Sequence, residues 1–446
     1  MNKVLAAISL SLLTATSLAA QGLYAPSGVQ LKVGSSASLK IGGSLTNRGQ
    51  VYDEGLLVVD GTVNNESRLN ISNNASTPPV LDSNGLINNT GNLENVGLIR
   101  VSGNWNNTGI YNGIDGEIEL DGTSDQTFSS TPTDVHSIVV NSTGTTLFSG
   151  DTVRVVGMIN FVNGYVDANP GTYLVIEDGA EVLGGSDNSY SEGKLYHRGL
   201  GYKFFPVGND ALYLPVYLEN VFGENPLIGV EVGAFSQAPF PDRLLVGVAE
   251  DYYWDIETVL GRFDSSRVTV DYVGADLESS QNRNDIAFDS ATPALAEAES
   301  LDEPFTNLFT TDDSVEDPDL FSSGLLTGEK SFTKRYLAVA LSPKVPADGV
   351  SYIPTAFSPL SVNEEDQVLK FYSEKVIPDG FSFKIYDRFG DVLYETNDLS
   401  DAQTNGWNGL LKSGKPASGG YYFYSAKFEF FNGRKVSKTG QVMLIR

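Results

Sequence analysis

A short repeat fills the first third of the chain, and it restricts the possible folds more than any other feature. Segments of the same pattern start at Leu39 and Leu57, 18 residues apart, and again at Ile99 and Ile118, 19 residues apart. Each unit has a short alternating strand, a glycine that permits a sharp bend, and an asparagine suited to left-handed backbone at a corner. A unit of this length cannot bury its own apolar side, so the units must stack. The repeat therefore predicts a parallel β-solenoid.

We expect the solenoid over residues 21–190, with about seven or eight coils at this period. A β-sandwich of regular hairpins is the alternative, because strands and turns alone do not separate the two folds. The coil length and the placement of glycine and asparagine resemble the solenoids of filamentous-haemagglutinin-like adhesins. That resemblance implies adhesion.

The first 20 residues have the pattern of a secretory signal peptide. Lys3 precedes an uncharged run from Val4 to Ala20 that ends in small residues. The serines and threonines within the run argue against a membrane anchor. The chain has no cysteine, so disulfides and thiolate metal sites are excluded. The sequence thus predicts an exported protein held together by cores and sheets.

The chain is strongly acidic. It has 29 Lys and Arg against 56 Asp and Glu, a net charge of −27 at pH 7. Such a surface repels phosphate backbones, so we expect no nucleic-acid partner.

A second β-rich region is expected over residues 191–346. Its predicted strands run over Leu212–Leu218, Leu227–Val232, Leu244–Val248, Val268–Tyr272 and Arg335–Leu341. These strands favour a β-sandwich with a long acidic loop. The acidic run from Asp312 to Asp319 could chelate Ca²⁺, but its spacing fits no calcium motif, and a solvated loop is favoured. Ala294–Glu299 alone has helical composition, and it is too short to stand alone.

Residues suited to catalysis are few. The two histidines, His136 and His197, sit in no catalytic or metal-binding motif, and we expect no cofactor and no metal. The most site-like cluster places acids beside aromatic rings, as glycosidases do: Asp251, Asp255, Glu257, Tyr252, Tyr253 and Trp254. Alternation offers a simpler interpretation, with Tyr252, Trp254 and Ile256 on a buried strand face and the acids outward.

Five motifs follow one another between Ser351 and Arg446. They begin at Ile353, Phe383, Trp407, Gly419 and Lys438 and read IPTAFSP, FKIYDRFG, WNG, GGYYFY and KTGQVMLIR. In this order they resemble the gliding motility-associated C-terminal domain, the type B sorting domain of the type IX secretion system. The resemblance implies a sorting and anchoring domain over residues 347–446 with these motif residues: Pro354, Phe357, Pro359, Tyr386, Arg388, Gly390, Trp407, Gly409, Gly420, Tyr422, Gly440 and Arg446.

The resemblance also implies a route and partners. The chain would pass through the periplasm and the type IX secretion translocon to the cell surface or the medium, often with a porin-like outer-membrane partner. One segment departs from the family, because Leu360–Asp366 stands in place of an Asn-Gly-Asp-Gly-type loop. A role of that loop therefore does not carry over to this chain.

The same residues independently favour an immunoglobulin-like sandwich of about seven strands. Phe383, Ile385 and Phe389 alternate with polar residues and are expected to be buried. Asn405-Gly406 and Asn432-Gly433 are turn pairs, the second of which closes a hairpin. Tyr386, Arg388 and Trp407 are recognition or structural residues, and the structural interpretation is favoured.

These observations favour a non-enzymatic surface protein, an adhesin or a structural component of the envelope or gliding apparatus. Its solenoid would be a spacer or a surface for an extracellular glycan or protein ligand. The alternative is a surface carbohydrate-active hydrolase or lyase on a β-helix, which would need converging carboxylates in a groove.

Overall fold

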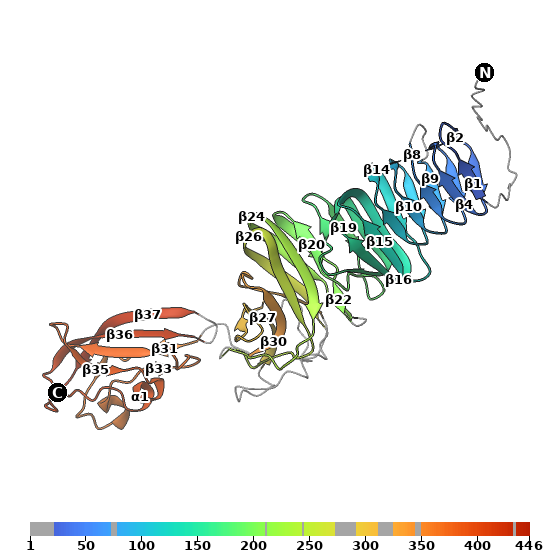
Figure 1. Ribbon diagram of the computed structural model, residues 1–446. Coiled ribbons are helices and arrows are strands. Elements are labelled where there is room, and N and C mark those ends of the chain that lie inside the picture. Colours follow the sequence, from blue (N-terminus) through green and yellow to red (C-terminus); the bar gives the residue numbers. More distant parts are fainter. Residues whose placement is uncertain are drawn as a thin grey trace, which may run out of the picture. The chain divides into compact units, whose positions relative to one another are not determined.

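The computed structural model describes residues 22–72, 78–209, 212–242, 245–272, 291–310, 324–343, 349–430 and 434–446. Within these ranges the fold is all-β, as the sequence predicts, with one short helix, α1 (Leu399–Thr404) (Figure 1). No helix in these ranges has the length and apolar character to cross a membrane. The expected signal peptide, the acidic run from Asp312 to Asp319 and the Asn432-Gly433 pair lie outside the described residues.

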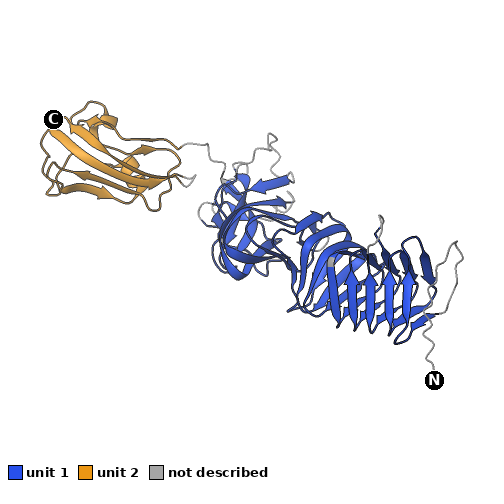
Figure 2. Ribbon diagram, turned by 90° about the horizontal axis from the view of Figure 1, so that it is seen from above, with its two compact units in different colours: residues 1–342 blue, residues 343–446 orange. Residues whose placement is uncertain are grey.

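The chain forms two compact units, residues 1–342 and residues 343–446 (Figure 2). The first unit contains both the solenoid and the β-rich region that follows it. The second unit contains the five C-terminal motifs.

The solenoid is built of three parallel ladders of stacked strands (Figure 1). The first ladder contains β1 (Gly22–Ala25), β4 (Ser44–Asn47), β7 (Val63–Asn65), β10 (Ile87–Asn89), β13 (Trp105–Asn107), β15 (Gln126–Ser130), and parts of β16 (Thr133–Gly150) and β17 (Val153–Ala168). The second contains β2 (Gln30–Val33), β5 (Gln50–Asp53), β8 (Arg68–Ile71), β11 (Asn92–Asn95) and the start of β14 (Ile110–Leu120). The third contains β3 (Ser38–Ile41), β6 (Leu56–Val59), β9 (Val80–Ser83), β12 (Leu98–Val101), the end of β14, further parts of β16 and β17, and β19 (Glu181–Gly184).

The strand register follows the sequence repeat. Leu39 pairs with Leu57, and Ile99 pairs with Ile118. Because the ladders are parallel, the alternative of a hairpin sandwich is wrong for this region. The eight strands of the first ladder agree with the expected seven or eight coils.

The corner asparagines form a buried ladder. Asn47 Nδ2 donates to Asn65 Oδ1 at 2.8 Å, Asn65 Nδ2 to Asn89 Oδ1 at 2.7 Å, and Asn89 Nδ2 to Asn107 Oδ1 at 2.6 Å. Each of the first three amides also donates to a backbone carbonyl of the next coil. Hydrogen bonds from coil to coil thus satisfy amides that are fully removed from water.

The bend glycines and corner asparagines have a different physical role from the expected one. None of these asparagines, and neither Gly85 nor Gly103, has a positive φ. A Cβ atom on Gly85 would lie 2.6 Å from the carbonyl oxygen of Gly61, and one on Gly103 would lie 2.5 Å from the carbonyl carbon of Gly85. Glycine is required here because successive coils approach closely, not because the backbone is left-handed.

The solenoid ends on a strand that belongs to two ladders. Strand β20 (Leu195–Arg198) pairs in parallel with β18 (Leu174–Ile176), so that His197 lies opposite Ile176. On its other edge β20 pairs antiparallel with β24 (Val216–Gly233), so that His197 lies opposite Ile228. The parallel coils therefore continue into antiparallel sheet without a break in hydrogen bonding.

The strand pairs that follow β20 in the first unit are antiparallel, beside an isolated parallel bridge between Pro241 and Phe305. This region contains β21 (Gly201–Phe205), β22 (Gly208–Asn209), β23 (Leu212–Tyr213), β24, β25 (Gly247–Val248), β26 (Tyr253–Tyr272), β27 (Ala291–Ala298), β28 (Thr306–Asn307), β29 (Gly324–Thr327) and β30 (Tyr336–Pro343). Trp254 faces the core that continues from the solenoid, whereas Tyr253 packs against a second cluster around Phe305. The segment with helical composition, Ala294–Glu299, lies largely in β27, because burial outweighs its helix propensity.

The second unit is a sandwich of seven described strands. One sheet has the order β32 (Ala356–Phe357), β37 (Lys435–Leu444), β36 (Gly420–Glu429), β34 (Ser382–Tyr386), β35 (Val392–Thr396), and the other pairs β31 (Ser351–Tyr352) with β33 (Tyr372–Ser373). A 3₁₀ turn at Glu364–Gln367 occupies the segment that departs from the family. The predicted hairpin is β36–β37. Phe383 and Ile385 are buried as predicted, but the prediction for Phe389 is wrong, because it lies in the turn after β34 and is 76% exposed.

Candidate functional site

An aromatic cluster brings three of the C-terminal motifs together. The Trp407 ring is buried, with its centroid 5.4 Å from that of Phe357 and 4.9 Å from that of Tyr422. Trp407 Nε1 donates to the Leu410 carbonyl at 2.9 Å, and the Tyr422 hydroxyl donates to the Ser418 carbonyl at 2.8 Å. Both polar atoms are satisfied, so this cluster acts as core.

Arg446 binds the backbone of the loops beside that cluster. Its Nη2 donates to the Gly409 carbonyl at 2.7 Å, and its Nε donates to the Ala417 carbonyl at 3.1 Å. Gly409 has a φ of +74°, which glycine adopts without strain, and a Cβ there would lie 3.1 Å from the Pro359 side chain. Arg446 thus connects its own strand end to the loop that carries Trp407.

The turn between β34 and β35 carries the next motif. Asp387 accepts hydrogen bonds from the backbone N–H groups of Phe389 at 2.8 Å and Asp391 at 2.9 Å, and Gly390 has a φ of +91°. The exposed Arg388 guanidinium lies 4.8 Å from the centroid of the Phe389 ring. Burial and the nearby Asp387 carboxylate raise the pKa of Tyr422, while Arg446 and Arg388 oppose the rise. Tyr386, the last residue of β34, pairs with Phe423 beside Tyr422, so this turn lies at the same end of the sandwich as the Trp407 cluster.

The remaining motif residues have local roles. Tyr386 is half-buried at the end of β34 and Pro354 half-buried between β31 and β32, while Gly420 starts β36 with a φ of +147°. A Cβ on Gly440 would lie 2.4 Å from the Tyr424 hydroxyl oxygen, so this glycine makes room for a cross-strand ring. Gly440 and Pro354 lie outside the Trp407 cluster.

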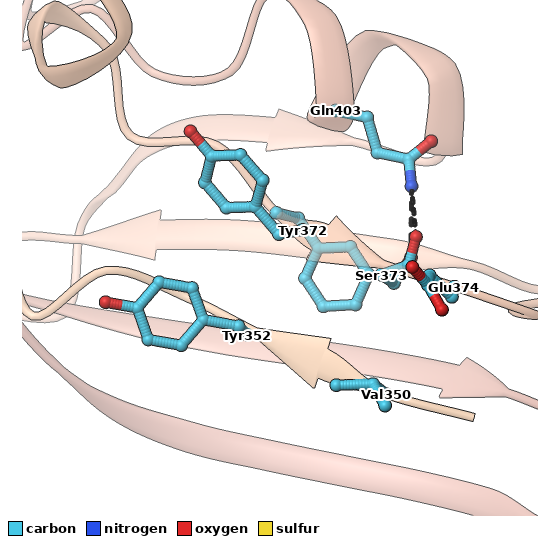
Figure 3. Close-up of a pocket in the computed structure, with 7 residues that line it drawn as sticks. Val350, Tyr352, Tyr372, Ser373, Glu374 and Gln403 are labelled. Carbon is cyan, nitrogen blue, oxygen red and sulfur yellow. Dashed lines mark hydrogen bonds between the residues drawn. The ribbon is translucent and has the colours of Figure 1, made fainter. Parts of the chain in front are cut away.

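A hollow of about 340 Å³ in the second unit was not foreseen from the sequence (Figure 3). The rings of Tyr352 and Tyr372, cross-strand partners with centroids 6.2 Å apart, line it, and Gln403 reaches over from α1. Gln403 Nε2 donates to the backbone and side-chain oxygens of Ser373, both at 3.1 Å. The sequence signal was weak, because the lining residues come from three separate segments.

The acidic cluster of the first unit is an ion-pair network. Lys194 Nζ lies 2.9 Å from Asp255 Oδ2 and 2.8 Å from Glu257 Oε2, and Arg335 Nε lies 2.6 Å from Asp255 Oδ1. Tyr252, Trp254 and Ile256 share a buried face, as the alternation predicts. Asp255 is also buried, so the expectation that it points outward is wrong, because two cations compensate its charge.

The charge state of Asp255 follows from these contacts. Burial raises its pKa, but hydrogen bonds from Arg335 and Lys194 outweigh burial, and the pKa ends below its ordinary value. A glycosidase general acid needs the opposite, a raised pKa. Lys194 and Arg335 are 61 and 80 residues from Asp255 in the chain, and no sequence pattern pointed to them.

The two histidines lie apart, in different coils. His136 Nδ1 lies 3.0 Å from Ser137 Oγ on β16. His197 is buried at the end of the solenoid beside Phe205, and burial together with the nearby Lys203 lowers its pKa to about 3. Among the described residues, no three His, Asp or Glu side chains are arranged to hold a metal ion.

Neither a curated protein nor a solved structure matches the chain. A protein family does match part of it. Residues 352–444, which lie in the second unit, match the CHU_C Type IX secretion signal domain. The chain therefore combines a β-solenoid scaffold with a C-terminal type IX secretion signal domain, by which it interacts with that machinery and is exported to the cell surface or the extracellular space.

Proposed function

We propose that the protein is a non-enzymatic surface protein, an adhesin or a structural component of the envelope or gliding apparatus. Its solenoid serves as a spacer or as a binding surface for an extracellular glycan or protein. The chain crosses the inner membrane by its signal peptide, passes through the periplasm, and is retained at the outer membrane by a porin-like partner.

The observation that carries this proposal is the use of charge on the solenoid surface. Lys32 Nζ lies 2.8 Å from Glu54, Arg48 Nε 2.7 Å from Glu66, and Arg100 Nε 2.7 Å from Glu119. Each pair joins one coil to the next. These carboxylates therefore form ion pairs between stacked coils. In a hydrolase or lyase, carboxylates would instead point together toward a substrate.

The lowered pKa of Asp255 adds support. The most site-like acid of the sequence is held ionised by two cations, and it is thus unsuited to protonating a glycosidic oxygen. The carbohydrate-active alternative thus loses its most site-like acid.

The test compares cells that lack the protein with cells that carry it. Loss of the protein is expected to reduce attachment to surfaces or gliding speed, and the purified full chain is expected to release no sugar from polysaccharides. Release of reducing or unsaturated sugars by the purified chain would overturn the non-enzymatic assignment. Unchanged attachment and gliding would overturn the adhesive and structural roles.

A further inference from the structure

One face of the five-stranded sheet in the second unit carries apolar side chains that the described residues of that unit leave partly exposed. Cross-strand pairing makes them neighbours, because Ala356 and Tyr421 both pair with Met443, and Tyr386 pairs with Phe423. Tyr421 is 58% exposed, Phe423 46% and Met443 40%. We call this surface the outer face and define it by these residues: Ala356, Tyr386, Tyr421, Phe423 and Met443.

Strand alternation explains why the side chains of the outer face do not belong to the core. Tyr422, Val442 and Leu444 point to the opposite side of the same strands and are buried there. The outer face spans four strands without a gap, and Ile445, which is 47% exposed, extends it past the end of β37. A soluble domain seldom exposes a contiguous apolar surface of this kind unless a partner covers it.

The composition of the outer face is typical of protein interfaces. Tyr, Phe and Met are enriched at the centre of such interfaces, and Arg is enriched with them. Arg388 follows Tyr386 by two residues in the turn after β34, and the exposed Lys427 follows Tyr421 and Phe423 on the same side of β36. A partner that fits is therefore apolar at its centre, with carboxylates at its rim.

The second unit differs from the rest of the chain in its net charge. Residues 351–446 contain 11 Asp and Glu and 11 Lys and Arg, so the whole net charge of −27 belongs to residues 1–350. A partner with an acidic rim would repel the rest of the chain and accept this unit. Such selectivity suits a signal domain that the secretion machinery must recognise whatever protein is attached to it.

We infer that the outer face is the surface by which the type IX secretion machinery binds this signal domain. The inference rests on the sorting role of residues 352–444 and adds the location of the contact. The partner is the component of that machinery with an apolar surface rimmed by carboxylates. A second copy of the chain is the competing occupant, and the cross-linking test below distinguishes it from a component of the machinery.

The first test replaces Phe423 and Met443 together by serine in the full chain. Both side chains point away from the core, so the unfolding midpoint of the second unit should stay unchanged. The exported fraction should fall at least about tenfold, as the loss of ~1.4 kcal/mol of binding free energy would produce. The matched control is Val362→Ser, an apolar residue that is fully exposed on a loop outside the sheet, and it should be exported normally.

The possible outcomes distinguish the binding role of the outer face from the sorting role of the whole domain. Normal export of Phe423→Ser/Met443→Ser, with a chain lacking residues 351–446 still retained in the cell, would overturn the outer face and leave the sorting role intact. Normal export of that truncated chain would overturn both. If the double variant unfolds, Phe423→Tyr/Met443→Leu keeps the apolar surface and should be exported.

The second test places a photo-cross-linking phenylalanine analogue at position 423, and as a control at position 362, in intact cells. The expected product at position 423 is an adduct with an outer-membrane component of the secretion system, absent at position 362. An adduct of twice the chain's mass would show self-association and would contradict the inference. Equal adducts at both positions would contradict it as well.

Discussion

Asp53 is a carboxyl group enclosed in the solenoid wall. Its Oδ1 accepts a hydrogen bond from the Gly55 N–H at 3.0 Å, and its Oδ2 has no partner among the described residues. Burial raises the pKa of Asp53 to about 7. The same ladder position two coils on holds Asn95, whose Oδ1 accepts from Gly97 and whose Nδ2 donates to the Glu117 carbonyl at 3.2 Å. An amide thus suits this position better than an ionised carboxylate.

Replacing Asp53 by asparagine should stabilise the first unit in a pH-dependent way. The folded pKa lies above the unfolded one, so the wild-type chain has its full stability below about pH 4 and loses it as the pH rises through about 7. Asp53→Asn removes that loss and should raise the free energy of unfolding by on the order of 4 kcal/mol at pH 8 and by little at pH 4. Denaturant titrations at both pH values measure the difference.

The reciprocal variant is the control. Asn95→Asp places a carboxyl in the equivalent position, so it should destabilise the unit at pH 8 and much less at pH 4. A pH-independent effect of either variant would show that desolvation of the carboxyl is not the cause.

At the C-terminal end of the chain, Arg446 is the residue with the clearest structural role. Arg446→Ala removes two hydrogen bonds to the Gly409 and Ala417 carbonyls and should lower the free energy of unfolding of the second unit by ~2 kcal/mol. Arg446→Lys should recover part of it, because one ammonium reaches only one of the carbonyls well. Thermal unfolding of the full chain distinguishes the variants, and equal midpoints for all three would contradict this role.

At the scale of the element, the asparagine ladder adds buried side-chain hydrogen bonds between one coil and the next. Asn89 donates both to Asn107 Oδ1 at 2.6 Å and to the Ile110 carbonyl at 3.0 Å while fully buried. Its neighbour Asn88 bonds to Asn106 and Asn64 on the outer side of the same strand, where water competes. Asn88 and Asn89 carry the same side chain and differ in how far that side chain is buried.

Asn89→Ala should therefore destabilise the first unit by ~2 to 3 kcal/mol, since it leaves buried partners unsatisfied. Asn88→Ala is the matched control and should cost well under 1 kcal/mol, because its partners can turn to water. Both are measured by urea denaturation. Equal losses in the free energy of unfolding for the two variants would mean that burial of the asparagine ladder adds nothing to stability.

The sequence predicted elements best where a pattern repeats or alternates. The spacing of Leu39, Leu57, Ile99 and Ile118 gave the solenoid register, and alternation gave the buried faces of Phe383 and Trp254. Helix α1 was missed, although Asp398 caps it by accepting from the N–H groups of Ser400 and Asp401, because six residues are too short for a helical period. The prediction that Phe389 is buried was wrong, because the apolar and polar residues of the sequence continue to alternate after β34 has ended at Tyr386.

Sites assembled from distant segments were the least predictable. The motif residues Phe357, Trp407 and Tyr422 were each singled out, but their contact depends on tertiary packing. Lys194 and Arg335 were not singled out, since nothing in a local pattern shows that two cations neutralise Asp255. The hollow between Tyr352 and Tyr372 was missed for the same reason.

At the scale of the whole molecule, the chain divides into an acidic scaffold and a neutral signal domain. Removing Ser351 to Arg446 should leave the first unit folded, because its cores contain no residue of the second unit. The truncated chain should accumulate in the periplasm instead of reaching the surface. Cell fractionation measures this, and surface display of the truncated chain would contradict the sorting role.

Strand β20 has a mechanical consequence for a protein displayed outside a cell. Its two edges are bonded at once, to the last coil on one side and to β24 on the other. A force that passes from the antiparallel strands into the coils is therefore carried in part by backbone hydrogen bonds on both edges of this one strand.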